Sequence, residues 1–293
     1  MKSKTKLLGR IDFESNSLRK DLDIISKFPV FEEEYNEFNS GTWINNSLWN
    51  DDGDYQNTQY KDNKNKAKMT ELGKQTLYIN EIINKYFDVE NLKMVRTRNL
   101  INGQVIPHKD FIELGDNKGK YIRVLIPLET SLTSYHSDED YGVFRMLKGD
   151  IWMLDASVVH AAYNFGDGNR VILCLDFQYD GVDNVDPSLI FKDKSIHDET
   201  IEAMVFQRAP LREQDVSDFI FDISKSIYNL EDLKSAILKV SSAHVHHDIP
   251  IKETYDILIE ATKSKGGDIY NTCHEMKEYY TVNRKLGERF TTV

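Results

Sequence analysis

The spacing of apolar residues divides the chain into a helical beginning, a β-rich centre and a helical end. Apolar residues at helical spacing predict one helix on each side of Pro29 within residues 17–38, because proline interrupts a helix. Residues 76–87 (TLYINEIINKYF) predict another amphipathic helix. Between these segments, residues 39–70 are rich in Asn, Asp and Gly and predict a long loop, a kind of segment that often takes part in binding. The aromatic residues of this loop are expected mainly to pack.

The centre of the chain predicts a β structure. From about residue 92 to 179, seven short runs of alternating or β-branched residues are separated by turn signals: KMVRTRNLI, QVIPHKDFIEL, YIRVLIPL, GVFRML, DIWMLD, VVHAAYNF and RVILCLDFQY. Short strands in such a series are typical of a sandwich or barrel. Helical patterns return after about residue 185. The chain is therefore predicted to be an α+β protein, with a β domain over residues 1–184 and a helical domain over residues 185–293.

Composition and charge narrow the partners. The 293 residues are 40% hydrophobic and 29% charged, as in a folded globular protein, and the net charge of -11 argues against a nucleic acid partner. No apolar run reaches the roughly 18–20 residues of a membrane helix, and the N-terminus lacks the apolar stretch of a secretory signal. Cys174 and Cys273 are expected to be unpaired thiols and not to form a disulfide. These features together predict a cytoplasmic protein with no membrane partner.

Histidine–carboxylate pairs raise the prospect of a metal site. A mononuclear non-haem Fe(II) site uses two His and one carboxylate, and residues two apart on a strand point to the same side. Four His-x-Asp/Glu pairs occur: His108/Asp110, His136/Asp138, His197/Glu199 and His246/Asp248. Only the first pair lies in a predicted strand, which begins after a predicted Asn102-Gly103 hairpin turn. The other pairs fall in a predicted loop, at a predicted helix start or between predicted helices, where the strand argument does not apply.

Two further residues complete a candidate site. His160 is the only other histidine inside a strand-like run of the β region, so it is the candidate third ligand. Arg170 follows ten residues later and opens the apolar run RVILCLDF. Alternation places Arg170, Ile172, Cys174 and Asp176 on one side of that strand. An inward arginine needs a partner, and its planar fork suits the carboxylate of an anionic ligand.

The pattern of His-x-Asp, a distal His and an Arg ten residues later resembles the 2-oxoglutarate/Fe(II)-dependent dioxygenases. More closely, four stretches resemble the L-proline cis-3-hydroxylases, and the likeness covers almost the whole chain: FPVFEEEYNEF, RTRNLINGQVIPHKDFIEL, YHSDED and GDIWMLDASVVHAAYNF. The resemblance implies a double-stranded β-helix, a jelly-roll or cupin-like core, with N-terminal helices and a helical C-terminal region. It also implies that His108, Asp110 and His160 hold Fe(II), and that Arg170 holds 2-oxoglutarate, with O2 as the other co-substrate.

The implied reaction is the hydroxylation of a free amino acid, with L-proline as the expected substrate and succinate and CO2 as co-products. Another small free amino acid, such as pipecolate, is the alternative substrate. Two rival classes are a cupin-like metal dioxygenase or epimerase without 2-oxoglutarate, and a non-catalytic β-barrel that only binds a ligand. Arg170 argues against the first rival, and the intact set of metal-binding residues argues against the second. A homodimer is compatible with the sequence.

A free amino acid needs a cation for its carboxylate, and three residues are the candidates. Arg123 lies in the apolar run YIRVLIPL and is expected to point inward. His136, in the family-like stretch YHSDED, and Arg98 are the other two. Arg96 has the same standing as Arg98, because the same hairpin decides both, and for Arg145 a surface ion pair is expected.

The orientation of Arg98 depends on the predicted hairpin. If Asn102-Gly103 forms a two-residue turn, Thr97 faces His108, and both Arg96 and Arg98 point to the opposite face. A three-residue or bulged turn reverses this arrangement. The sequence leaves both registers open.

Overall fold

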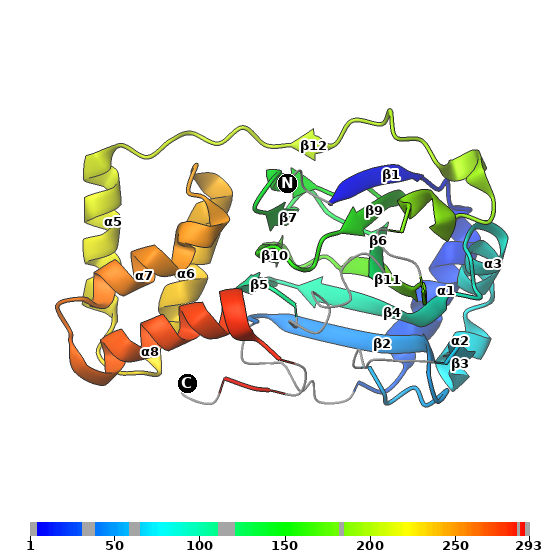
Figure 1. The fold of residues 1–293 in the computed structure, drawn as a ribbon, viewed down its shortest axis with the longest axis horizontal. Helices are drawn as coiled ribbons and strands as arrows, with labels where there is room; N and C mark the ends of the chain where they lie inside the picture. Colours follow the sequence, from blue (N-terminus) through cyan, green and yellow to red (C-terminus); the bar gives the residue numbers. More distant parts are fainter. Residues whose placement is uncertain are drawn as a thin grey trace.

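The computed structural model describes residues 5–30, 39–58, 65–110, 121–181, 185–285 and 288–290. Two antiparallel sheets face each other between two layers of helices (Figure 1). The seven-stranded sheet has the order β1 (Lys6–Arg10), β9 (Asp150–Leu154), β6 (Tyr121–Glu129), β11 (Arg170–Gln178), β4 (Leu92–Ile101), β2 (Thr42–Asn50) and β3 (Lys68–Met69). The five-stranded sheet has the order β12 (Met204–Val205), β8 (Gly142–Arg145), β7 (Ser134–Asp138), β10 (His160–Asn164) and β5 (Gly103–His108).

The strands β4 to β11 form a double-stranded β-helix, which confirms the predicted fold class. β4 pairs with β11, β5 with β10, β6 with β9, and β7 with β8, so the first strand of this series meets the last and the pairing continues inward. Successive pairs alternate between the two sheets: the first and third pairs lie in the seven-stranded sheet, and the second and fourth pairs lie in the five-stranded sheet. This is the jelly-roll arrangement, and it brings residues far apart in sequence to one end of the core.

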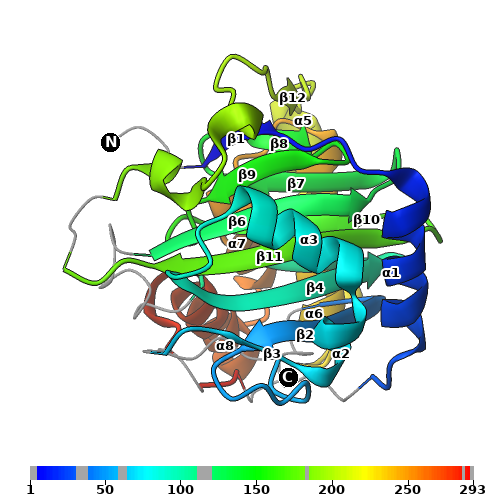
Figure 2. The same ribbon diagram turned by 90° about the vertical axis from the view of Figure 1, so that its right-hand side faces the viewer.

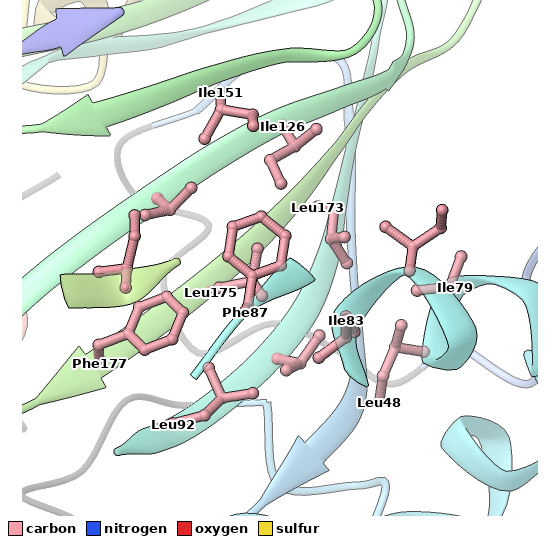
Figure 3. Close-up of a cluster of buried hydrophobic side chains, with 14 of the residues drawn as sticks. Leu48, Ile79, Ile83, Phe87, Leu92, Ile126, Ile151, Leu173, Leu175 and Phe177 are labelled. Carbon is pink, nitrogen blue, oxygen red and sulfur yellow. The ribbon is translucent and has the colours of Figure 1, made fainter. Parts of the chain in front are cut away.

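Helices α1 (Ser15–Lys27), α2 (Glu71–Gln75) and α3 (Leu77–Tyr86) cover the outer face of the seven-stranded sheet (Figure 2). The predicted helix before Pro29 is confirmed, and Phe28 is already extended, as the residue before a proline prefers. The predicted helix over residues 76–87 is also confirmed. Ile79, Ile83 and Phe87 pack on the sheet residues Leu173 and Leu175 in one buried cluster (Figure 3).

The C-terminal region covers the five-stranded sheet. It contains α5 (Glu213–Ser226), α6 (Asp232–His246), α7 (Thr254–Thr262), α8 (Gly267–Glu278) and the π-helical turn η5 (Tyr279–Asn283). The apolar faces of these helices share one buried cluster with Val105 and Ile106 of β5 and Ala162 of β10. None of the helices in the described parts of the chain is both long and apolar enough to cross a membrane.

The predicted loop over residues 39–70 is wrong for its first part. Residues 42–50 form β2, which pairs with β4 and buries Trp49. The Asn-rich composition concealed this strand because Asn50 serves the turn that follows it: its side-chain amide donates to the Asp54 and Asn57 carbonyls. The predicted helix after Pro29 falls on residues 31–38, and one aromatic residue of the predicted loop, Tyr60, falls on residues 59–64. Both lie outside the described residues.

The predicted Asn102-Gly103 hairpin is also wrong. Asn102 does have a positive φ of 44°, but β4 and β5 lie in different sheets, so the chain crosses between sheets at this point. Thr97 therefore pairs with Leu173 and does not face His108. Arg98 pairs with Ile172, whose side chain belongs to the cluster between the sheets, so Arg98 points inward.

The interior of the jelly roll has an apolar end and a polar end. The apolar end contains Leu125, Phe144, Trp152, Ile172 and Cys174 in one buried cluster. Charged and imidazole side chains gather in the other end. The two groups adjoin each other, since the His136 and Phe144 ring centroids lie 5.2 Å apart.

The packing of α3 on the seven-stranded sheet predicts a test of the fold. Leu173 is 1% exposed within this cluster, and Leu173→Ala is expected to lower the free energy of unfolding by about 2–5 kcal/mol because it leaves a cavity. Leu132→Ala is the control, since that side chain is 80% exposed, and its effect should stay within about 0.5 kcal/mol. Urea unfolding of both variants measures the difference, and equal losses would contradict this packing.

Candidate active site

Two strands and the loop after one of them bring His108, Asp110 and His160 together. β5 ends at His108, β10 begins at His160, and the two residues pair directly across the sheet. Asp110 lies just beyond β5, where its backbone N–H donates to the Ala156 carbonyl over 3.0 Å. Asp110 Oδ1 is 3.6 Å from His108 Nε2 and 3.8 Å from His160 Nε2. Within the described residues, this is the group of His and acidic side chains close enough to share a metal ion.

The backbone fixes the orientation of both imidazoles. His108 Nδ1–H donates to the Ile106 carbonyl over 2.9 Å, and His160 Nδ1–H donates to the Val158 carbonyl over 3.0 Å. A carbonyl only accepts, so Nδ1 carries the proton in both rings and Nε2 keeps its lone pair beside Asp110. Metal-binding histidines are commonly oriented by such a hydrogen bond to their other nitrogen. Two imidazoles and one carboxylate form a donor set that suits Fe(II).

The protonation states also suit a metal ion. Burial, and then the charge of His108, lowers the pKa of His160 to about 3, and burial lowers the pKa of His108 as well. Burial alone would raise the pKa of Asp110, but Arg123 and the two histidines outweigh it and hold that pKa well below its usual range. Neutral imidazoles and an ionised carboxylate are the forms that bind a metal.

Arg123 lies between two carboxylates. The prediction that it points inward is confirmed: its side chain is 2% exposed and contacts Asp110 on one side. On the other side its Nε donates to Asp176 Oδ1 over 2.8 Å, and the Tyr121 hydroxyl donates to the same oxygen over 2.5 Å. Sequence reasoning placed Asp176 on the inward face but gave it no role. Its place on the same inward face of β11 as Arg170 was the available signal.

Arg170 and Arg98 bring two more cations into the polar end of the core. Arg170 begins β11 and is buried, and burial together with the nearby Arg98 lowers its pKa to about 10. Burial, followed by the charge of Arg96, lowers the pKa of Arg98 to about 10 as well. Among the residues that the structure describes, no carboxylate forms an ion pair with either guanidinium. The Arg98 guanidinium lies 6.0 Å from the Trp43 ring centroid.

His136 was predicted to lie in a loop, and that prediction is wrong. It lies in β7, opposite Ala162 of β10, and its ring stacks 6.1 Å from the His160 ring. Burial, and then the charge of Arg170, lowers the pKa of His136 well below its usual range. Neither ring nitrogen has a hydrogen-bond partner within the described parts of the chain. β7 escaped notice because its inward residues are polar, as the site requires.

The residues of the other His-x-Asp/Glu pairs make contacts of a structural kind. Asp138 accepts from the Asp140 and Tyr141 backbone N–H groups, so it caps the turn after β7. His197 and Glu199 form an exposed contact of 3.3 Å. His246 is exposed and stacks on Phe165. Strand context alone would not have separated the first pair from His136/Asp138, since β7 is also a strand; the proximity of a third ligand does.

Arg96 and Arg145 have protein partners. The Arg96 guanidinium donates to the Thr58 carbonyl over 2.8 Å and lies 3.5 Å from Asp176 Oδ2. Arg145 lies over the rings of Tyr135 and Phe206 near the surface. Among the described parts of the chain, these contacts leave Arg98 and Arg170 as the inward cations without an ion-pair partner.

A jelly roll that gathers two histidines and one aspartate at its polar end defines a class, the Fe(II)- and 2-oxoglutarate-dependent dioxygenases. Comparisons with known proteins agree. A family model described as "L-proline 3-hydroxylase, C-terminal" matches residues 187–288, and one described as "Aspartyl/Asparaginyl beta-hydroxylase" matches residues 10–179.

Curated relatives narrow the class. The chain is 34% identical to L-proline cis-3-hydroxylase 1 and 35% identical to L-proline cis-3-hydroxylase 2, both from Streptomyces sp, with 97% of each chain covered. It is 26% identical to an L-proline cis-4-hydroxylase from Rhizobium meliloti (strain 1021), over 98% of this chain and 99% of the relative. The chain therefore belongs to the L-proline cis-3-hydroxylase family. It is an oxidoreductase that uses Fe(II), 2-oxoglutarate and O2.

The geometry predicts a metal site that depends on His160. We expect the purified protein to bind Co(II), a spectroscopic substitute for Fe(II), and His160→Ala to weaken this binding by more than about 100-fold, beyond the 10–100-fold typical of changes outside the ligand set. His246→Ala is the matched control, since it removes a histidine from another His-x-Asp pair. Isothermal titration calorimetry measures the affinities, and an unchanged affinity in His160→Ala would place the metal elsewhere.

Proposed function

We propose that the protein hydroxylates free L-proline at carbon 3 on the cis face, converting 2-oxoglutarate and O2 to succinate and CO2. The observation that carries the proposal is the group of His108, Asp110 and His160 beside two inward arginines that have no ion-pair partner among the described residues. Identity of 34–35% over nearly the whole chain to L-proline cis-3-hydroxylases supports the choice of substrate. In this proposal the three residues of the group hold Fe(II).

When bound, Fe(II) and 2-oxoglutarate would together activate O2, so that one oxygen atom enters a C–H bond of the substrate and the other enters succinate. Arg170 binds the carboxylate of 2-oxoglutarate that is remote from the metal. A guanidinium fork suits this task because it donates two parallel hydrogen bonds to a carboxylate. Its burial strengthens the interaction, since little water competes for the charge.

Arg98 binds the carboxylate of the amino acid in this proposal, and His136 borders the same space. Arg98 is half-buried, faces inward and has no ion-pair partner among the described residues, so the substrate carboxylate would compensate its charge. His136 lies between His160 and the apolar Phe144, with ring centroids 6.1 and 5.2 Å away. An uncharged imidazole there can donate one hydrogen bond to a polar group of either ligand.

Arg123 acts through Asp110 in this proposal. With Asp176 holding its other side, Arg123 fixes the carboxylate of Asp110 beside the two imidazoles. The apolar cluster of Phe144, Trp152 and Leu125, which adjoins His136 through Phe144, excludes water from the reacting groups. The charged groups of the site are thus oriented before any ligand binds.

We also propose two units and a compartment. Residues 1–184 would form the catalytic unit, and residues 185–293 the unit that supports it. The cytoplasm is the proposed location, because Cys174 and Cys273 are both free and buried, as is usual in a reducing compartment.

A panel of free amino acids tests the proposed substrate. The protein is incubated with Fe(II), ascorbate, 2-oxoglutarate and one amino acid at a time, and succinate and product mass are measured. L-Proline should give succinate and a product heavier by one oxygen atom, with NMR placing the hydroxyl on carbon 3, cis. Faster turnover of pipecolate would move the assignment to that amino acid. Absence of substrate-dependent succinate from every small amino acid would overturn the hydroxylase proposal.

Substitutions of Arg170 and Arg98 should change the KM values of different ligands. Arg170→Met should raise KM for 2-oxoglutarate about 10–100-fold, and Arg98→Met should raise KM for L-proline by a similar factor, because each loses a hydrogen-bonded ion pair. Each variant should leave the KM of the other ligand nearly unchanged. Arg212→Met is the control, since that side chain is 84% exposed on the surface. If both variants raised both KM values equally, the assignment of one arginine to each ligand would be wrong.

A further inference from the structure

β5, the strand that ends at His108, is an edge strand. It pairs with β10 on one side only, so its other edge must find hydrogen-bond partners elsewhere. Near its start, Ser40 supplies one of them: its backbone N–H donates to the Gln104 carbonyl over 2.8 Å. At its end, beside His108, the partners come from the C-terminal region. The end of β5 around His108 therefore contacts helices that follow it in the chain by more than a hundred residues.

The contacts involve the peptide groups on both sides of His108. The Tyr255 hydroxyl donates to the Pro107 carbonyl over 2.8 Å, which belongs to the peptide before His108. The Lys109 backbone N–H, which belongs to the peptide after His108, donates to the Tyr280 carbonyl over 2.7 Å. Arg284 makes a longer contact of 3.5 Å to the Lys109 carbonyl. The C-terminal region therefore contacts the peptide groups both before and after His108.

Tyr255 and Tyr280 form one rigid support. Their rings stack with centroids 6.2 Å apart and an angle of 16° between the planes, and both side chains are almost fully buried. Tyr280 belongs to the π-helical turn η5, a widened form of helix that is common at functional sites. The Tyr255 ring lies within the core of the C-terminal helices, so its hydroxyl has a fixed position.

We propose that Tyr255 is a positioning residue for the metal ligand His108, and that the C-terminal region acts as a brace for the metal site through the peptides flanking that ligand. The proposal rests on the proposed metal site. A hydrogen bond to a buried backbone carbonyl sets the plane of the peptide that carries the His108 N–H. Losing it frees the backbone of the ligand while leaving the imidazole itself unchanged.

The test compares two buried tyrosines that both connect the β core to the C-terminal region. Tyr255→Phe removes the hydroxyl at the metal segment. Tyr163→Phe is the matched control, because Tyr163 is also 0% exposed and its hydroxyl contacts Ser241 of α6 over 3.1 Å, without touching residues 107–110. Co(II) affinity is measured by calorimetry, and the visible spectrum of bound Co(II) reports the ligand geometry.

Tyr255→Phe is expected to weaken Co(II) binding about tenfold and to change the Co(II) spectrum, at the lower end of the effect of changes around a ligand set. Tyr163→Phe should match the wild type in both readouts. Wild-type affinity and spectrum in Tyr255→Phe would overturn the inference while leaving the proposed metal site intact. Equal weakening in both variants would also overturn it, because it would indicate a general loss of packing. A wild-type protein that binds no Co(II) would overturn the proposed site and this inference together.

Hydrogen exchange supplies a second readout that does not need metal. The backbone amides of residues 105–110 should exchange faster in Tyr255→Phe than in the wild type. Their exchange rate in Tyr163→Phe should equal that of the wild type. The same exchange rate for this peptide in all three proteins would contradict a bracing role for Tyr255.

Discussion

Within the described residues, the polar end of the jelly roll holds more positive charge than its carboxylates balance. Among the described residues there, the guanidinium groups of Arg96, Arg98, Arg123 and Arg170 face only Asp110 and Asp176. Burying an unpaired charge is unfavourable. Burial is the largest cause that lowers the pKa of both Arg98 and Arg170 to about 10. Anionic ligands would remove this imbalance. The site is therefore built for carboxylates, as the co-substrate 2-oxoglutarate and a free amino acid both require.

The jelly roll makes this concentration of charge sustainable. Because its first strand pairs with its last, β4, β6 and β11 place their inward arginines next to one another, while β5 and β10 deliver the two histidines from the opposite sheet. The helices α1 and α3 seal the outside of one sheet with a large apolar cluster, and the C-terminal helices seal the other. The stability of these outer layers offsets a polar interior that would be unfavourable by itself.

Much of the site could be predicted from the sequence because it depends on spacings of a few residues along one strand. The alternation along β11 that turns Arg170 and Asp176 inward depends on strand geometry alone. The strand argument for His108 and Asp110 holds only in part, because Asp110 lies just beyond the end of β5. The failures came where tertiary structure decides. The turn at Asn102 could be a hairpin or a crossing between sheets, and only the pairing of β5 with β10 distinguishes the two. β7 and β2 carry polar residues because one faces the site and the other serves a turn, so composition concealed both. The contact of Tyr255 with Pro107 joins residues 148 positions apart and has no sequence signal.

A crystal structure of the protein with Mn(II), 2-oxoglutarate and L-proline, with the metal located by anomalous scattering, tests the central claim most directly. The account predicts Mn(II) coordinated by His108 Nε2, Asp110 and His160 Nε2, the far carboxylate of 2-oxoglutarate on Arg170, and the L-proline carboxylate on Arg98. A metal ion bound by other residues, or a 2-oxoglutarate molecule away from Arg170, would contradict it.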